Sequence, residues 1–429
     1  MPSTPQPAPV EALLRLYQAA LAAADPMKVV PAWLPPPPRG RTVVVGLGKA
    51  AASMARAVEA HWPASLSGVV VVPPGAALPL KHIEICECSH PVPDARSVAA
   101  AGRLMQAVTD LTADDLVIAL ISGGGSALCC LPAPGLRLAD KQHITRELLQ
   151  RGATITEINT VRRHLSAIKG GRLAAQAHPA AVVTLLISDI PGDEPTLIAS
   201  GPTLADPSTC EDALAVLRRF GIDDLPQVIQ ALSRGEWESI KPGDPRLQNH
   251  RHHIIASAWD GLNAAAQQGT RDGWACHILS DAMEGEARDL AKAHAAIALS
   301  VVQRGVPFAP PCVILSGGEA TVTLRGQGRG GRNTEFALAL AMALEGQPGA
   351  DRIHALSAGT DGLDGRARAA GAWIAPGTLA DARAQGLHPR TLLDANDSAT
   401  LLDGVGALVH TGPTLTNIND FRAILVDAP

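Results

Sequence analysis

The sequence predicts an α/β protein with two domains, on three observations. The chain has 429 residues, well above the roughly 250–300 residues at which a single hydrophobic core stops growing. Hydrophobic residues make up 46% of the chain, which is enough for a sizeable core. Short apolar segments alternate with segments of helical periodicity, a pattern that is typical of parallel sheets covered by helices on both faces.

The first half of the chain supplies most of this alternation. Apolar residues recur at helical spacing from Val10 to Ala24, and Pro35–Pro38 then end the helix and form a stiff connector. Strands are expected at 41–45, 68–72, 116–121 and 182–187, and further helices at 50–61, 94–108, 140–151 and 160–177. Gly-rich or Asp-bearing turns follow these strands, so ligands are expected at the carboxyl edge of the sheet.

A polar, proline-bearing stretch from Arg234 to His250 is interpreted as the connection to the second domain. That domain is expected to begin with a strand at 253–256 and to continue with strands at 275–279, 313–315 and 353–357. The predicted boundaries are 10–240 for the N-terminal domain and 250–426 for the C-terminal domain.

Composition excludes several classes of protein. The net charge is −5 and aromatic residues are 3% of the chain, so a nucleic-acid partner is not expected. No apolar run approaches the roughly 20 residues of a membrane helix, and no signal-like start is present. The seven cysteines include no C-x-x-C pair and no zinc spacing. We therefore expect a cytoplasmic protein with reduced thiols and no membrane partner; a homo-oligomer is compatible with the sequence.

The first Gly-rich turn follows the strand at 41–45 and contains Gly46, Gly48 and Lys49. It resembles the dinucleotide pattern G-x-G-x-x-A, but the next strand ends in Val72-Pro73, where an acid should hold a ribose. The chain has only seven lysines. One of them beside a helix N-terminus suits a carboxylate or phosphate, although a solvated lysine on a tight turn is the alternative.

A second candidate anion site lies further along the same predicted sheet. Ser122, Gly123, Gly124, Gly125 and Ser126 follow the strand at 116–121. Consecutive glycines allow backbone N–H groups to converge on an anion, and the two hydroxyls add donors.

The predicted helix at 160–177 adds basic residues. Arg162, Ser166 and Lys169 are spaced by four and three residues, so one helix face is expected to hold a negative group. A solvated basic face is the alternative.

Acids follow several of the other predicted strands. Asp189 and Asp193 come after the strand at 182–187, where an acid at the end of a buried strand is costly unless it binds something. Either is a candidate for binding a metal or orienting a hydroxyl. Glu319 and Asp361 follow the strands at 313–315 and 353–357 and are further candidate metal ligands.

Two Gly-rich turns of the second half suit a polyphosphate. Gly317 and Gly318 precede Glu319, and the segment 328–335 reads G-R-G-G-R-N-T-E before a long apolar helix. Gly330, Gly331 and Arg332 are candidate ATP contacts, and Asn333 is expected to cap the helix.

In this order the turns resemble the class II glycerate kinases, the glycerate 2-kinase family with a MOFRL C-terminal domain; such sequences are sometimes labelled hydroxypyruvate reductase. The resemblance covers about residues 10–426. It rests on V-G-L-G-K-A-A, S-H-P-V-P-D, S-G-G-G-S-A-L, T-V-R-R-H-L-S-A-I-K-G-G-R-L, S-D-I-P-G-D, I-A-S-G-P-T, S-G-G-E, G-G-R-N-T-E, G-T-D-G-L-D-G and T-G-P-T-L-T-N-I-N-D.

The resemblance implies a Rossmann-like N-terminal domain, a smaller C-terminal α/β domain and an active site in the cleft between them. It implies ATP, a divalent metal such as Mg²⁺, glycerate as acceptor and 2-phosphoglycerate as product. Lys49 and Arg332 match its proposed active-site residues. After S-D-I-P-G-D this chain has Glu194-Pro195-Thr196, where relatives often have small apolar residues, so the roles of Asp193 and Glu194 stay open. The alternatives are a hydroxypyruvate reductase that uses NAD(P)H and a non-enzymatic sugar-acid sensor.

Overall fold

The computed structural model describes residues 8–428, which form two compact units. Unit 1 contains the chain up to Asp25, the short segment Asp189–Gly192 and the chain from Ala256 onward. Unit 2 contains Pro26–Ser188 and Asp193–Ile255. Each unit is built on a six-stranded sheet, and the predicted α/β class is confirmed. Within residues 8–428 no helix is both long and apolar enough to span a membrane.

The sheet of unit 2 has the strand order β3-β2-β1-β4-β5-β6. Its strands are β1 (Thr42–Leu47), β2 (Ser67–Val72), β3 (Ile83–Glu87), β4 (Leu116–Ile121), β5 (Ala181–Ile187) and β6 (His250–Ala256). The β1–β2, β2–β3, β1–β4 and β4–β5 pairs are parallel. Every residue of β1 and β4 is buried, which explains their unbroken apolar sequences.

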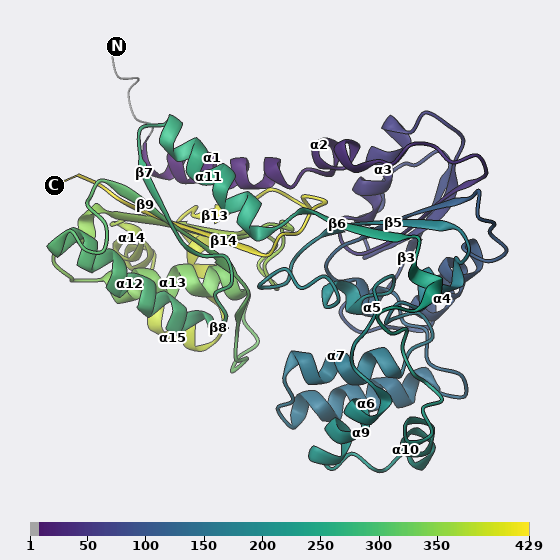
Figure 1. Cartoon of the computed structure of the whole chain (residues 1–429). Helices are drawn as coiled ribbons and strands as arrows, with labels where there is room; N and C mark the ends of the chain where they lie inside the picture. The colour runs from purple at the N-terminus through teal and green to yellow at the C-terminus, as the bar shows by residue number, and fades with distance from the viewer. Residues whose placement is uncertain (1–7, 429) are drawn as a thin grey trace. The chain divides into compact units, whose positions relative to one another are not determined.

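The strand order of this sheet reverses between β1 and β4. From β1 the chain proceeds to β2 and β3 on one side, and then returns to β4 and β5 on the other side. The crevice at the carboxyl ends of two such strands is where open α/β sheets bind ligands. Helix α3 (Ala51–His61) lies on one side of this sheet and α4 (Ala95–Ala107) on the other (Figure 1).

A group of helices in unit 2 has its own hydrophobic core. Helices α6 (Leu138–Gln150), α7 (Ile155–His164), α9 (Cys210–Arg219) and α10 (Pro226–Ser233) pack through residues such as Ile144, Val161 and Leu214 (Figure 1). Shorter elements complete the unit: α2 (Pro26–Val29), η1 (Pro31–Trp33), α5 (Gly125–Leu128), α8 (Arg172–Gln176), η2 (Ile198–Ser200) and η3 (Pro245–Leu247).

The sheet of unit 1 is mixed, in the order β13-β12-β11-β14-β9-β7. Its strands are β7 (Ala275–Ser280), β9 (Cys312–Gly318), β11 (Ile353–Gly359), β12 (Gly371–Ile374), β13 (Leu408–Val409) and β14 (Asp420–Val426). Only the β7–β9 pair of this sheet is parallel within the described chain. Two short strands, β8 (Gly285–Glu286) and β10 (Ala320–Thr321), pair separately.

Helices cover both faces of this second sheet (Figure 1). Helices α1 (Pro9–Ala23) and α11 (Ala258–Arg271) pack on one face, where the Tyr17 hydroxyl donates to the Gly359 carbonyl at 2.7 Å. The other face is covered mainly by α12 (Ala287–Arg304) and α13 (Arg332–Leu344). The remaining helical elements are η4 (Ala350–Arg352), α14 (Thr378–Ala384), α15 (Pro389–Asp394) and α16 (Ser398–Gly404).

Three features differ from the expected organisation. The predicted helix at 160–177 is wrong: α7 ends at His164, and α8 begins only after Gly170 and Gly171, whose φ angles of 59° and 79° are left-handed. Helix α1, expected in the N-terminal domain, packs in unit 1. Strand β6, expected to open the C-terminal domain, is instead an edge strand of the unit 2 sheet, where the Val182 amide donates to the Asn249 carbonyl at 3.1 Å.

Candidate active site

The turns after β1 and β4 are hydrogen-bonded to each other at the point where the strand order reverses. Gly48 has a φ of 127°, and a Cβ at this position would lie 2.3 Å from the Ser122 hydroxyl. The Lys49 amide donates to the Gly123 carbonyl at 2.9 Å, and the Ala50 amide donates to the Ser122 hydroxyl at 3.0 Å. Gly48 is therefore required by the close approach of two chain segments, and the first amides before α3 already have partners.

The backbone amides that are still available to a ligand lie in the second turn, Ser122–Ser126. Within residues 8–428 the amides of Gly123, Gly124 and Gly125 donate no hydrogen bond. Gly124 has a φ of 80°, and a Cβ there would lie 3.4 Å from Lys49 Cγ and 3.2 Å from His90 Nε2. A lysine and a histidine thus flank a turn with three amides available to an anion. His90 lies in the motif S-H-P-V-P-D, which carried part of the resemblance, but no role was predicted for this histidine.

A strained turn packs against these glycines. Ala199 and Ser200 are consecutive non-glycine residues with φ angles of 51° and 62°, a conformation that costs on the order of 1–3 kcal/mol for each residue. A Cβ at Gly125 would meet the Ala199 Cβ at 2.7 Å. The Ser126 and Ser200 hydroxyls are 2.7 Å apart, and the Ser200 hydroxyl donates to the Asn159 Oδ1 at 3.4 Å. Backbone strain of this kind often marks a functional site.

Two lysines beneath the turn are buried without a carboxylate partner in the described chain. Lys169 is 2% exposed, and its Nζ donates to the carbonyls of Ser126 at 3.0 Å and Ala199 at 3.3 Å. Burial, together with the nearby Lys141, lowers the pKa of Lys169 to about 7. Lys141 donates to the Leu165 carbonyl at 3.0 Å, and burial lowers its pKa to about 8. Lys169 therefore positions the Gly-rich and strained turns relative to each other.

Arg162 differs from these lysines because its charged group has no partner among the described residues. Its side chain is half-buried on α7, and within residues 8–428 the guanidinium makes no hydrogen bond or ion pair. Burial lowers its pKa. The predicted single helix face of Arg162, Ser166 and Lys169 is wrong, because α7 ends at His164. A cation that is desolvated and unpaired nevertheless favours a bound anion.

In unit 1 the strand ends bring a second set of polar residues together. Asp420, the first residue of β14, lies in register between Gly318 of β9 and Gly359 of β11. Arg332 Nε donates to Asp420 Oδ1 at 2.8 Å, its Nη2 to Asn419 Oδ1 at 3.3 Å, and its Nη1 to Glu319. Burial opposes the charge of Arg332, but these two carboxylates outweigh it and raise its pKa.

The start of α13 is capped by a residue that the sequence analysis did not identify. Asp364 accepts hydrogen bonds from the amides of Asn333 at 2.9 Å and Thr334 at 2.8 Å. Burial raises the pKa of Asp364 to about 6. The expected cap by Asn333 is wrong: its Nδ2 donates to Asp420 at 2.9 Å, and its Oδ1 accepts from Ser357 at 2.7 Å.

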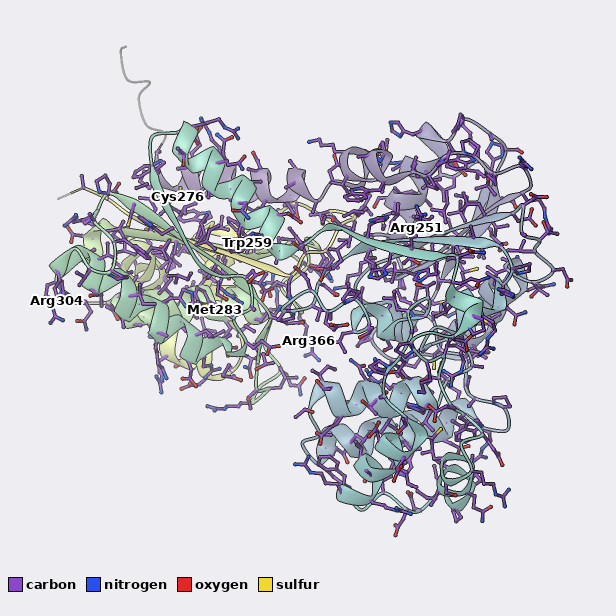
Figure 2. The ribbon with its side chains drawn as sticks, in the orientation of Figure 1. Arg251, Trp259, Cys276, Met283, Arg304 and Arg366 are labelled. Carbon is purple, nitrogen blue, oxygen red and sulfur yellow. The ribbon has the colours of Figure 1, made fainter. Side chains whose placement is uncertain are left out.

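Close packing explains the glycines that were predicted to contact ATP. A Cβ at Gly330 would lie 2.7 Å from the Ser398 hydroxyl, and one at Gly331 would lie 2.4 Å from the Asp364 Oδ1. A Cβ at Gly318 would lie 2.2 Å from the backbone nitrogen of Met283, the residue labelled in Figure 2, and Gly317 accepts a hydrogen bond from that nitrogen at 3.2 Å. These four glycines have structural roles in the fold of unit 1.

The candidate metal ligands are distributed over both units. Asp189 accepts a hydrogen bond from Asn417 Nδ2 at 2.9 Å, and Asp361 accepts one from the Leu363 amide at 3.0 Å; both belong to unit 1, as does Glu319. Asp193, with a φ of 54°, belongs to unit 2. Within residues 8–428 these acids do not form a group of three ligand atoms within 4.8 Å of one another.

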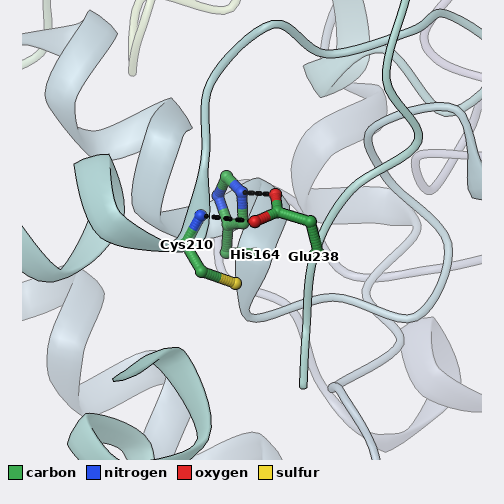
Figure 3. A group of neighbouring side chains, drawn as sticks. All are labelled: His164, Cys210 and Glu238. Atoms are coloured by element: carbon green, nitrogen blue, oxygen red, sulfur yellow. Dashed lines mark hydrogen bonds and ion pairs between the residues drawn. The ribbon is translucent and has the colours of Figure 1, made fainter. Parts of the chain in front are cut away.

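Such a group of three does occur elsewhere in unit 2. It consists of His164, Cys210 and Glu238 (Figure 3).

Two family descriptions match the chain. Residues 12–234 match the family described as "Domain of unknown function (DUF4147)", and residues 312–420 match the MOFRL family. A protein of Agrobacterium vitis, provisionally named hydroxypyruvate reductase, is 52% identical over 97% of this chain and 94% of its own length. The D-glycerate 2-kinase of Thermotoga maritima is 39% identical over 95% of this chain and 96% of its own. The crystal structure of the Thermotoga maritima glycerate kinase superposes with a TM-score of 0.87 at 38% identity, covering 97% of this chain and 99% of that one.

Proposed function

Because the chain belongs to the glycerate kinase family that combines the DUF4147 and MOFRL domains, we propose that it is a glycerate 2-kinase. It transfers the γ-phosphoryl group of ATP to the 2-hydroxyl of D-glycerate and forms 2-phosphoglycerate. The single observation that carries the assignment of a site is the turn Ser122–Ser126, with its three available amides beside Lys49.

The acceptor is assigned to unit 2. The carboxylate of glycerate is a small anion, and the amides of Gly123, Gly124 and Gly125 supply the converging donors that such a group needs. Lys49 and Arg162 add positive charge. The hydroxyl of Ser126, whose proton is directed at Ser200, offers an acceptor for a substrate hydroxyl. Lys169 holds the turn in place from below, through the Ser126 carbonyl.

The phosphate groups of ATP are assigned to Arg332 in unit 1. Two of its contacts are to residues buried in the unit, Asp420 and Asn419, whereas the third is to the exposed Glu319. The buried contacts thus hold the Arg332 guanidinium in one orientation, with its outer edge toward Glu319. A phosphate oxygen could replace the carboxylate of Glu319 there. A guanidinium held in this way stabilises charge on a transferring phosphoryl group.

The acids of unit 1 suit Mg²⁺ because they offer only oxygen ligands, the donor type that this ion prefers. Asp189 and Asp361 are the residues that would hold it, whereas Glu319, paired with Arg332, is the carboxylate that a phosphate oxygen would replace. The ion, when bound, neutralises phosphate charge. The chain's own part is to position the reacting groups, because phosphoryl transfer depends on aligning the attacking oxygen with the phosphorus.

A reductase that uses NAD(P)H is the second candidate, since the Agrobacterium vitis relative has that name. Two observations disfavour it. The amides of Lys49 and Ala50, which a pyrophosphate would need, already donate to Gly123 and Ser122. Strand β2 ends at Val72, so no acid at that strand end is available for the ribose.

One set of assays separates the three candidate functions. The purified protein is given ATP, Mg²⁺ and D-glycerate in one reaction, and NADH with hydroxypyruvate in another. Formation of ADP together with a product that enolase dehydrates directly supports the 2-kinase. Oxidation of NADH without ADP formation would instead support the reductase, and glycerate binding without turnover of either cofactor would support a sensor.

A further inference from the structure

Three side chains of metal-binding type meet in unit 2, outside the candidate active site. His164 is the last residue of α7, Cys210 is the first residue of α9, and Glu238 follows α10 (Figure 3). Their ligand atoms all lie within 4.8 Å of one another. They are far apart in the sequence, which explains why no zinc spacing was found. We propose that they form a binding site for one thiophilic divalent cation, of which Zn²⁺ is the type.

The donor set selects the class of metal. One imidazole nitrogen, one thiolate sulfur and one carboxylate oxygen are the three ligand types found in zinc sites, and a site with three protein ligands leaves the fourth position for water. Mg²⁺ prefers oxygen ligands, so this cluster would not compete for the ion assigned to unit 1. His164 and Cys210 are buried at 0% and 3% exposure, whereas Glu238 is exposed and provides an entry path.

The imidazole of His164 is already oriented as in a metal-bound histidine. Its Nδ1 donates to the Thr160 carbonyl at 2.9 Å, and this directs Nε2 toward Glu238 Oε1, 3.1 Å away. A backbone carbonyl that fixes the other ring nitrogen is the usual outer-shell partner of a zinc-bound histidine. The carboxylate is fixed as well, because Glu238 Oε2 accepts from the Cys210 amide at 3.0 Å.

A lysine is the competitor that the metal must replace. Lys241 Nζ lies 2.5 Å from Glu238 Oε1. It also donates to the Ser208 carbonyl and to the Ser239 hydroxyl, the latter at 2.7 Å, so it keeps partners when Glu238 turns to a metal. Metal binding displaces the thiol proton, and any proton held between His164 and Glu238, to solvent.

The proposed metal site is linked through helix α7 to residues near the candidate active site. Helix α7 ends at His164 and carries Arg162 two residues earlier and Asn159 five residues earlier. A metal bound to His164 and Cys210 would fix the end of α7 to the start of α9. This coupling rests on the proposed function, whereas metal binding itself does not, so binding is tested without any activity measurement.

The test is a titration of the full-length, reduced and chelator-treated protein with Co²⁺, followed by displacement with Zn²⁺. We expect one Co²⁺ per chain, with a thiolate-to-cobalt charge-transfer band and the visible bands of tetrahedral cobalt. Cys210→Ser should abolish the charge-transfer band. Glu238→Gln should weaken Co²⁺ binding by at least about 10-fold, because the loss of even an outer-shell partner of a metal ligand weakens metal binding by about that much. Cys276→Ser, at a half-buried thiol on β7 (Figure 2), is the matched control and should leave the titration unchanged.

Lys241→Met keeps the proposal testable if the Cys210 variant does not fold. Removal of the competing ammonium should strengthen Co²⁺ binding by several-fold, a gain that an adventitious surface site would not show. Absence of the charge-transfer band in the wild type, or a band that survives Cys210→Ser, overturns the proposal. So does unchanged or weaker binding by Lys241→Met. None of these results depends on ATP or glycerate turnover, so failure of the metal site and failure of the kinase assignment are separate outcomes.

Discussion

Replacement of Lys169 by Met should remove a specific pH dependence from the stability of the protein. The ammonium is buried beneath the candidate anion turn, and its hydrogen bonds within residues 8–428 go to the carbonyls of Ser126 and Ala199. Burial, with a contribution from Lys141, lowers its pKa from 10.5 to about 7. Between these two values the unfolded chain still binds the proton that the folded chain has lost, so the stability of the wild type rises with pH.

The size of this rise follows from the two pKa values. Below pH 7 the ammonium is charged in both states, and the full cost of burying the charge is present. Between pH 6 and pH 9 the free energy of unfolding should rise by about 2.5 kcal/mol through Lys169 alone. Lys169→Met lacks this contribution.

Urea unfolding at pH 6 and pH 9, followed by far-ultraviolet circular dichroism, measures the difference between wild type and variant. The loss of two hydrogen bonds in Lys169→Met lowers the free energy of unfolding at both pH values by a similar amount. A purely structural role of Lys169 would therefore lower stability equally at pH 6 and pH 9 and leave its change with pH as in the wild type. Lys81→Met, at an exposed lysine of the same unit, is the control and should keep the wild-type slope. Equal slopes for wild type and Lys169→Met would refute a buried ammonium with a pKa near neutrality.

Three further outcomes test the proposed kinase site. Lys49→Ala should lower kcat/KM for glycerate by about 10²-fold, the effect of removing one preorganised charge-stabilising donor, with an unchanged circular dichroism spectrum; wild-type kinetics would show that the turn does not bind the acceptor. Glu319→Gln removes an exposed ion pair with Arg332, which is worth about 0–1 kcal/mol. The KM for ATP should therefore fall by up to about fivefold. A rise in KM would indicate that Glu319 binds the metal instead. Chelation of divalent cations should abolish phosphoryl transfer and Mg²⁺ should restore it, whereas full activity after exhaustive chelation contradicts the assignment to the acids of unit 1.

The unit 2 sheet was largely predictable because its central strands are buried on both faces. The expected strands at 41–45, 68–72, 116–121 and 182–187 agree within two residues with β1, β2, β4 and β5. Strand β3 was not predicted, and only one of its five residues, Ile83, is buried. An edge strand exposed in this way lacks the unbroken apolar sequence that identified its neighbours.

The candidate site was predictable at the level of turns and less so at the level of contacts. The turns with Lys49 and with Ser122–Ser126 do meet, because parallel strand order brings the ends of β1 and β4 together. The role of Asp364 was not predictable, since it caps α13 from 30 residues away in the sequence. Asp420 was overlooked for a similar reason: its importance depends on the antiparallel pairing of β14 with β9 and β11, which alternation of strands and helices does not reveal.

Two glycine-rich turns that look alike in the sequence have different chemistry in the structure. In the turn at Gly123–Gly125 the amides are available and Lys49 lies alongside, so the backbone itself can bind an anion. In the turn at Gly330–Gly331 the following amides of α13 donate to Asp364, which takes the position that a phosphate would need. A phosphate near this turn therefore depends on side chains and not on the α13 amides, with Arg332 as the fixed cation. This makes the geometry of the guanidinium decisive, because Arg332 uses Nε, Nη1 and Nη2 toward three separate acceptors, whereas a lysine offers a single charged group that cannot span them.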